Sequence, residues 1–292
     1  KQKLFANLKI YFTFPLVMIM QAISMGLSVG ASSVVARIMG VGDTAKAKLL
    51  NTHCIVLVLS LTAVLGLLVY FNLERFFTLL GAENKVLDLT LDYMQIWLLG
   101  MPFFTITLVG MTLMRAMGDA VTPGYLMTIG SSLHIVIAPF FIFGLLGLPA
   151  LGLKGAAVSF VMARTVSFLS YAYVMVIRDE LLTFKMAGFF SSCRDISHVG
   201  LPAVASNLIA PVSMSVITRL LAGHGAVVVA GFGVASRIES MIQMIIFALS
   251  MSLAPFVGQN WGAGYFQRVK LALRLANWFA LSWGLFAYIV LL

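Results

Sequence analysis

The sequence has few charged residues. Asp, Glu, Lys and Arg make up 10% of its 292 residues, whereas soluble domains carry about 25%. Hydrophobic residues reach 61% and the mean hydropathy is +1.03. The remaining polar residues could not coat so large an apolar core in water. The composition therefore excludes a soluble globular protein and predicts a membrane protein whose apolar excess faces lipid.

Cysteine and the motifs of soluble enzymes are also scarce. Cys54 and Cys193 provide neither a disulfide framework nor a metal-ligand spacing. The sequence contains no His/Cys cluster, paired carboxylates, phosphate-binding loop or nucleophile elbow. We therefore expect neither an enzyme nor a metal site nor a cofactor.

Eight apolar stretches are long enough to cross about 30 Å of hydrocarbon as helices of roughly 20 residues. They are too long for the strands of a membrane barrel, and open sheet edges are excluded in lipid. The sequence predicts an all-α polytopic membrane protein. The stretches lie near residues 10–36, 55–72, 93–114, 122–147, 155–177, 199–221, 227–257 and 272–292.

Basic residues alternate between the predicted loops. The loops after the first, third, fifth and seventh spans hold Arg37, Lys46, Lys48, Arg115, Arg178, Lys185, Arg194, Arg268, Lys270 and Arg274. The other loops hold only Arg75, Lys85 and Lys154. The positive-inside rule places the first set in the cytoplasm. The net charge of +9 then follows from topology, and we expect no nucleic-acid partner.

An internal repeat relates two parts of the chain. With a shift of 222 residues, segment 21–49 matches segment 243–271 at nine of 29 positions, including Gly40/Gly262 and Gly42/Gly264. The two copies lie six spans apart, so they cross the membrane in the same direction. This predicts two parallel six-helix bundles with eight of twelve helices present. The N-terminal bundle would cover residues 1–185, and residues 186–292 would start the C-terminal bundle.

Several stretches resemble the multidrug and toxic compound extrusion (MATE) transporters. The resemblance implies two six-helix bundles around a central cleft, in which the eight spans are helices two to nine of twelve. It also implies a multi-pass, monomeric protein of the plasma (inner) membrane that exports drugs or metabolites. The stretches are FTFPLVMIMQAISMGLSVGASSVVARIMGVGD (12–43), LLGMPFFTITLVGMTLMRAMGDAVTP (98–123), GLPA (200–203) and GVASRIESMIQMIIFALSMSLAPFVGQNWGAG (233–264).

One family feature is changed in this sequence. Many proton-coupled members place an Asn and an Asp four residues apart before a proline, where this chain has His134 and Ala138 before Pro139. The resemblance therefore leaves the coupling ion open between H⁺ and Na⁺.

Away from the span ends, three charged residues lie deep within the spans, namely Arg164, Arg237 and Glu239. A charge inside hydrocarbon is costly, so each is a functional candidate. Arg237 and Glu239 are two residues apart, about 200° around a helix, and cannot pair on one face. We predict ion coupling through Glu239, Arg237 and His134. The alternatives are a structural ion pair for Glu239 and a hydrogen bond within the bundle for His134.

Polar residues form related stripes on the first and seventh spans. On the seventh span, Gln243 and Ser250 follow Glu239 at helical spacing. The equivalent stripe on the first span consists of Gln21, Ser24, Ser28 and Ser32. The stripes predict a substrate cavity, or alternatively hydrogen bonds between packed helices. The candidate cavity residues are Gln21, Ser24, Met25, Ser28, Ser131, Gln243 and Ser250.

These observations favour a secondary active antiporter working by alternating access, with an amphipathic, cationic small molecule exported in exchange for H⁺ or Na⁺. One alternative is a lipid-linked glycan flippase of the same superfamily, which would use Arg164, Arg219 and Arg237 to bind pyrophosphate. A membrane-embedded enzyme is another.

Three histidines lie at the ends of spans, where we expect a surface position. They are His53, His198 and His224.

Overall fold

The computed structural model describes residues 2–79, 84–147, 149–183, 185–222 and 226–291, and within these ranges it contains helices and no strand. This confirms the all-α fold class. A 3₁₀ turn η1 (Leu145–Gly147) follows α4, and a π-helical turn η2 (Val174–Arg178) follows α5. The α-helices are α1 (Gln2–Val41), α2 (Thr44–Leu79), α3 (Asn84–Ala116), α4 (Val121–Phe143), α5 (Leu153–Tyr173), α6 (Phe189–Ala222), α7 (Ala226–Gly262) and α8 (Phe266–Leu291).

All eight described α-helices are long and apolar enough to cross a membrane. The eight predicted spans are therefore confirmed, although the helices extend beyond them. Arg37 and Arg115, expected in loops, instead lie near the C-terminal ends of α1 and α3. The predicted bundle boundary at residues 185 and 186 falls between η2 and α6, and the division into bundles stays a prediction.

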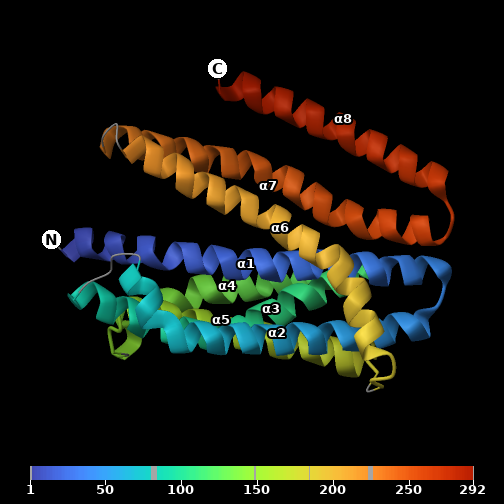
Figure 1. Ribbon diagram of the computed structural model, residues 1–292, viewed down its shortest axis with the longest axis horizontal. Coiled ribbons are helices and arrows are strands. Elements are labelled where there is room, and N and C mark those ends of the chain that lie inside the picture. The colour runs from blue at the N-terminus through green and yellow to red at the C-terminus, as the bar shows by residue number, and fades with distance from the viewer. Residues whose placement is uncertain (1, 80–83, 148, 184, 223–225, 292) are drawn as a thin grey trace.

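Helix α1 lies at the centre of the packing. It contacts α2, α3, α6 and α7, while α5 packs between α3 and α4 (Figure 1). One apolar core joins α1, α2, α3 and α6 through fully buried side chains such as Val35, Cys54, Val109 and Ile196. Helix α8 packs against α7 (Figure 1). The first half of the chain therefore carries most of the described core.

The turns after α1 and α7 have the same structure, as the internal repeat predicts. Gly42 and Gly264 both adopt positive φ angles, 91° and 76°, which glycine accepts without strain. The Gly42 amide donates to the Met39 carbonyl at 3.0 Å, and the Gly264 amide donates to the Trp261 carbonyl at 3.1 Å. The 222-residue shift therefore relates the backbone of these turns as well as their sequence.

The histidine predictions have mixed outcomes. His198 is exposed, as expected. His53 is fully buried, so the expected surface position is wrong. Its Nδ1 lies 2.8 Å from Ser192 Oγ, and its ring meets Phe189 edge-on. The reason is that α2 begins at Thr44, before the predicted span, and packs against α6. His224 lies outside the described residues.

Candidate functional site

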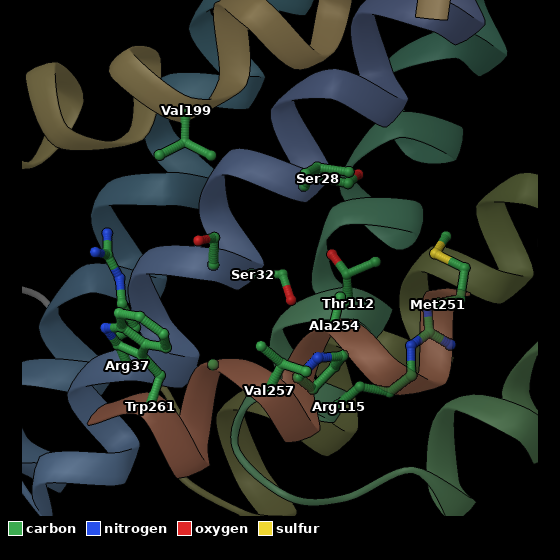
Figure 2. Close-up of a pocket in the computed structure, with 14 residues that line it drawn as sticks. Ser28, Ser32, Arg37, Thr112, Arg115, Val199, Met251, Ala254, Val257 and Trp261 are labelled. Carbon is green, nitrogen blue, oxygen red and sulfur yellow. The ribbon is translucent and has the colours of Figure 1, made fainter. Parts of the chain in front are cut away.

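A cavity of about 530 Å³ lies between α1, α3, α6 and α7. Figure 2 shows Arg37 and Trp261 on one side, Arg115 on the other, and Ser32 and Thr112 between them. The described residues that line the cavity are Ser28, Val29, Ser32, Ser33, Arg37, Thr112, Arg115, Val199, Met251, Ala254, Pro255, Val257, Gly258 and Trp261.

The lining combines positive charge, hydroxyl groups and apolar surface. Arg37 and Arg115 come from α1 and α3, and none of the described lining residues is acidic. Neither guanidinium forms an ion pair within the described part of the chain. The Arg115 Nε atom is buried there without a hydrogen-bond partner. The cavity therefore has two cationic groups that are free to bind an anion.

Two aspartates near these helix ends are used elsewhere. Asp43 Oδ1 accepts a hydrogen bond from the Lys46 amide at 2.9 Å, in the first turn of α2. Asp119 Oδ1 accepts from the amides of Val121 and Thr122 at 3.0 and 2.9 Å, at the start of α4. Its Oδ2 lies 3.5 Å from Arg178 Nη2. Both carboxylates therefore stabilise helix starts, as negative groups commonly do.

Burial acts to raise the pKa of the Asp119 carboxyl, but the Thr122 side chain, the Thr122 and Val121 amides and the Arg178 guanidinium outweigh it. The pKa is consequently held below its usual value. Asp119 stays ionised at neutral pH and fully engaged in these contacts.

Helices α1 and α7 cross closely beside the cavity. A side chain at Gly262 would overlap the Arg37 carbonyl, and one at Gly258 would meet the Ala36 side chain. Gln259 Nε2 also donates to the Ala116 carbonyl at 2.9 Å, which ties α7 to the end of α3. Figure 1 shows α7 diverging from α1 away from this end. The α1–α7 crossing therefore closes the cavity at these helix ends.

Arg164 lies in a cluster of aromatic side chains within the predicted N-terminal bundle. The Arg164 guanidinium carbon is 5.2 Å from the Phe104 ring centre and 5.4 Å from that of Phe160. Trp97 stacks on Phe160 at 5.4 Å, and His134 approaches the same ring edge-on at 6.1 Å. Arg164 is thus held by cation–π contacts, and His134 contacts the Phe160 ring.

The predicted cavity residues on α1 have different environments. Ser28 lines the cavity. Ser24 is buried, donates to the Met20 carbonyl at 2.9 Å and lies 3.0 Å from Thr105 Oγ1. Gln21 and Met25 are half-buried. Ser28 thus lies in the cavity wall, and Ser24 makes the helix-to-helix hydrogen bond that was the alternative.

The remaining predicted site residues lie on α4 and α7. Gln243 Nε2 donates to Glu239 Oε1 at 2.8 Å, and both side chains are exposed. Arg237 and Ser250 are exposed, and Ser131 on α4 is half-buried. These residues are outside the described lining of the cavity. Their roles in coupling and substrate binding stay predictions.

Sequence reasoning missed Arg37, Arg115 and Trp261 as cavity residues. The signal was helical spacing, because Arg37 follows Ser33 by four residues and Arg115 follows Thr112 by three. Assigning both arginines to loops concealed it. The side chain of Arg219 lies outside the described residues. Among the described residues, no group of three or more His, Cys, Asp or Glu side chains is arranged to hold a metal ion.

The fold and cavity define a polytopic helical membrane protein with a ligand-sized chamber between helices. The model of the MatE family matches residues 10–140 and 202–292. The chain belongs to this family of membrane transporters and is a multi-pass protein of the cell membrane. The family resemblance is thereby confirmed, and family members are transporters rather than enzymes.

Known proteins similar to the chain support this assignment. The FAD transporter of Shewanella oneidensis is 34% identical over 285 residues, which are 97% of this chain and 63% of that protein. The probable multidrug resistance protein YoeA of Bacillus subtilis is 23% identical over 271 residues, 91% of this chain and 58% of that protein. A mutant of the Vibrio cholerae MATE transporter VcmN superposes with a TM-score of 0.92 at 29% identity, over 97% of this chain and 64% of that one. The chain spans less than two thirds of each of these proteins.

Proposed function

We propose that the protein exports amphipathic small molecules by alternating access, in exchange for H⁺ or Na⁺. The observation that carries this proposal is the cavity of about 530 Å³. Its lining comes from both predicted bundles, with α1 and α3 belonging to the first and α6 and α7 to the second. A chamber between two bundles opens to opposite sides of a membrane when the bundles rock against each other.

The α1–α7 crossing supports a specific state in this cycle. The closed end carries the C-termini of α1, α3 and α7, which the positive-inside rule places in the cytoplasm. Away from this end α7 diverges from α1 (Figure 1). We assign this arrangement to a conformation closed toward the cytoplasm.

Glu239 is the proposed coupling residue. It lies eight residues beyond Gly231, where the described span of α7 begins, or about 12 Å along the helix axis. A carboxyl at that depth is costly unless it binds a proton, a cation or another polar group. Gln243 supplies one polar partner, and reversible binding of H⁺ or Na⁺ at the same carboxyl would link ion entry to substrate export.

The names of the relatives suggest two candidate substrate classes, FAD and drugs. The relatives include one named as an FAD transporter and others named as multidrug resistance proteins. The cationic substrate expected from the sequence stays a prediction, and the two arginines argue against it because like charges repel. The same arginines favour the flippase alternative, whose lipid-linked substrate carries a pyrophosphate.

Transport is tested by purifying the natural protein from the membranes of its own cells and reconstituting it into liposomes. Riboflavin, FAD and ethidium represent neutral, anionic and cationic aromatic compounds. We expect saturable flux of at least one of them, faster with an imposed H⁺ or Na⁺ gradient. Flux equal to that of protein-free liposomes for all three compounds and for a fluorescent polyprenyl diphosphate would contradict the proposal.

A further inference from the structure

We propose that the cavity between α1, α3, α6 and α7 is a binding site for a diphosphate ester that carries an aromatic ring. In this arrangement Arg37 and Arg115 bind the phosphate oxygens, and Trp261 packs against the ring. The inference rests on the proposed function, because it assigns the charge and shape of the substrate that this chamber accepts.

The charge balance of the cavity is the first argument. Two guanidinium groups line one chamber, and its described lining contains no carboxylate. The nearby Asp43 and Asp119 accept hydrogen bonds from helix starts instead. Charged groups in a membrane protein are expected to pair with opposite charge. An anionic ligand would provide the partner that the described part of the protein does not.

The chemistry of the donors selects phosphate among anions. Guanidinium groups present planar forks of N–H donors that match two oxygens of a phosphate. The Arg115 Nε atom is buried and has no acceptor among the described residues. Two arginines on opposite sides of the chamber in Figure 2 suit a group with several charged oxygens, as a diphosphate has.

The hydroxyl groups of the lining divide into two sets. Ser28 Oγ donates to the Ser24 carbonyl at 2.8 Å, and Thr112 Oγ1 donates to the Val109 carbonyl at 2.6 Å. Ser32 and Ser33 line the cavity without a hydrogen bond of this kind in the described chain. Their hydroxyl protons are available to an acceptor in the chamber, and phosphate oxygens are strong acceptors.

Trp261 provides the surface for a ring. Its side chain lines the cavity, is 54% exposed and meets Phe266 edge-on with ring centres 5.0 Å apart. Indole rings stack well on flat aromatic systems. The volume of about 530 Å³ also lies in the range of about 300–1,000 Å³ that is usual for small-molecule sites.

Binding to the purified protein in nanodiscs tests the site independently of transport. The probes are ADP, inorganic pyrophosphate and riboflavin, and the variants are Arg115→Gln, Arg37→Gln and Arg115→Lys. We expect each Gln variant to weaken ADP and pyrophosphate binding at least about tenfold, and Arg115→Lys to weaken it less. Riboflavin has no phosphate, so its affinity should change less than about twofold. ADP that binds both Gln variants as it binds the natural protein would overturn the inference, and so would the absence of ADP binding.

Two further variants separate the roles within the site. Arg194 is exposed on α6 and outside the described cavity lining, so Arg194→Gln makes the same charge change without an effect on ADP. Trp261→Ala should weaken ADP and leave pyrophosphate unchanged, because only ADP has a ring. Equal losses for both probes, or an Arg194→Gln effect as large as that of Arg115→Gln, would contradict the assignment.

Separate outcomes distinguish the site from the proposed function. Arginine-dependent ADP binding without flux of any compound would support the site and contradict export. Flux with ADP binding unaffected by the arginines would contradict the site and leave export standing. Competition against ADP in the nanodisc by FAD, which has both a diphosphate and aromatic rings, supports the proposed site. Competition by a polyprenyl diphosphate as strong as that by FAD would contradict the role of Trp261, because the lipid has no aromatic ring.

Discussion

At the scale of single residues, the same charge can serve topology, helix stability or binding, and its partners decide which. Arg178 lies beside Asp119 and Asp179 and holds a surface network together. Arg164 is held between two phenylalanine rings. Arg37 and Arg115 line the cavity and have no carboxylate partner in the described chain, and these two properties together make them binding candidates. The two arginines are left without a partner because the nearby Asp43 and Asp119 already accept hydrogen bonds at the starts of α2 and α4.

Asp119 should make stability depend on pH. Its folded-state pKa is lowered, so its ionised contacts stabilise the protein above the unfolded pKa of about 3.9. This stabilisation is lost as the pH falls through the folded pKa. Asp119→Ala should lower the thermal midpoint at pH 7, corresponding to about 1 kcal/mol, and the deficit should shrink below about pH 4. Thermal unfolding in detergent across this range is the measurement.

The control for Asp119 is Asp119→Asn. Asparagine caps helices about as well as aspartate and does not titrate, so most of the stability at pH 7 should remain. A deficit in Asp119→Ala that stays constant from pH 7 to pH 3 would rule out the ionised contacts as its cause.

Ser192 should stabilise the protein through His53. Ser192→Ala would leave the buried His53 Nδ1 without its partner at 2.8 Å, which costs about 1–3 kcal/mol. In a His53→Leu background the same serine change should cost much less. The measurement is a double-mutant cycle of unfolding free energies, and additive effects of the two changes would contradict the coupling.

At the scale of elements, apolar length and charge parity predicted eight helices correctly but not their ends. Helix α1 continues to Val41 and α3 to Ala116. The predicted spans ended earlier because a window chosen for its apolar residues stops at the first charge, whereas a helix can continue into the polar interface of the membrane. The cavity lies at those ends, so its arginines were missed, whereas Ser28, inside the apolar window, was among the predicted residues and lines the cavity. The glycine turns were predictable, since the repeat preserves a residue type that a positive φ requires.

The crossing of α1 and α7 should depend on small residues. Gly262→Val places a side chain against the Arg37 carbonyl and should push the helices apart. We expect a longer distance between spin labels on the cytoplasmic ends of α1 and α7 than in the unsubstituted helices, and a shift toward the state open at that end. Gly233→Val on the same helix is the matched control, because a Cβ at Gly233 meets no described atom within 4 Å. Identical label distances in the two variants would refute this role.

At the scale of the whole molecule, packing is uneven. The described core joins α1 to α3 and includes only Ile196 from α6, while α7 and α8 expose many large apolar side chains. The cavity lies where these two parts meet. A tightly packed first half beside helices that share fewer contacts is the arrangement in which relative motion at the shared surface is expected. The alternating access that we propose would then concentrate movement around the cavity.

The ion coupling that we propose for Glu239 is a property of the whole transport cycle. Glu239→Gln is nearly isosteric and can keep a hydrogen bond to Gln243, so it removes the titrating charge with little change in packing. In liposomes, an imposed H⁺ or Na⁺ gradient should accelerate flux through the natural protein and leave the variant unaffected, while exchange without a gradient continues. Glu74→Gln, at an exposed position in the span of α2, is the control and should retain the ion response. Because 100 mV is equivalent to about 2.3 kcal/mol per charge moved, the membrane potential is held at zero so that a charged substrate does not mask the gradient. Gradient-driven acceleration of Glu239→Gln equal to that of the natural protein would remove Glu239 from the coupling step.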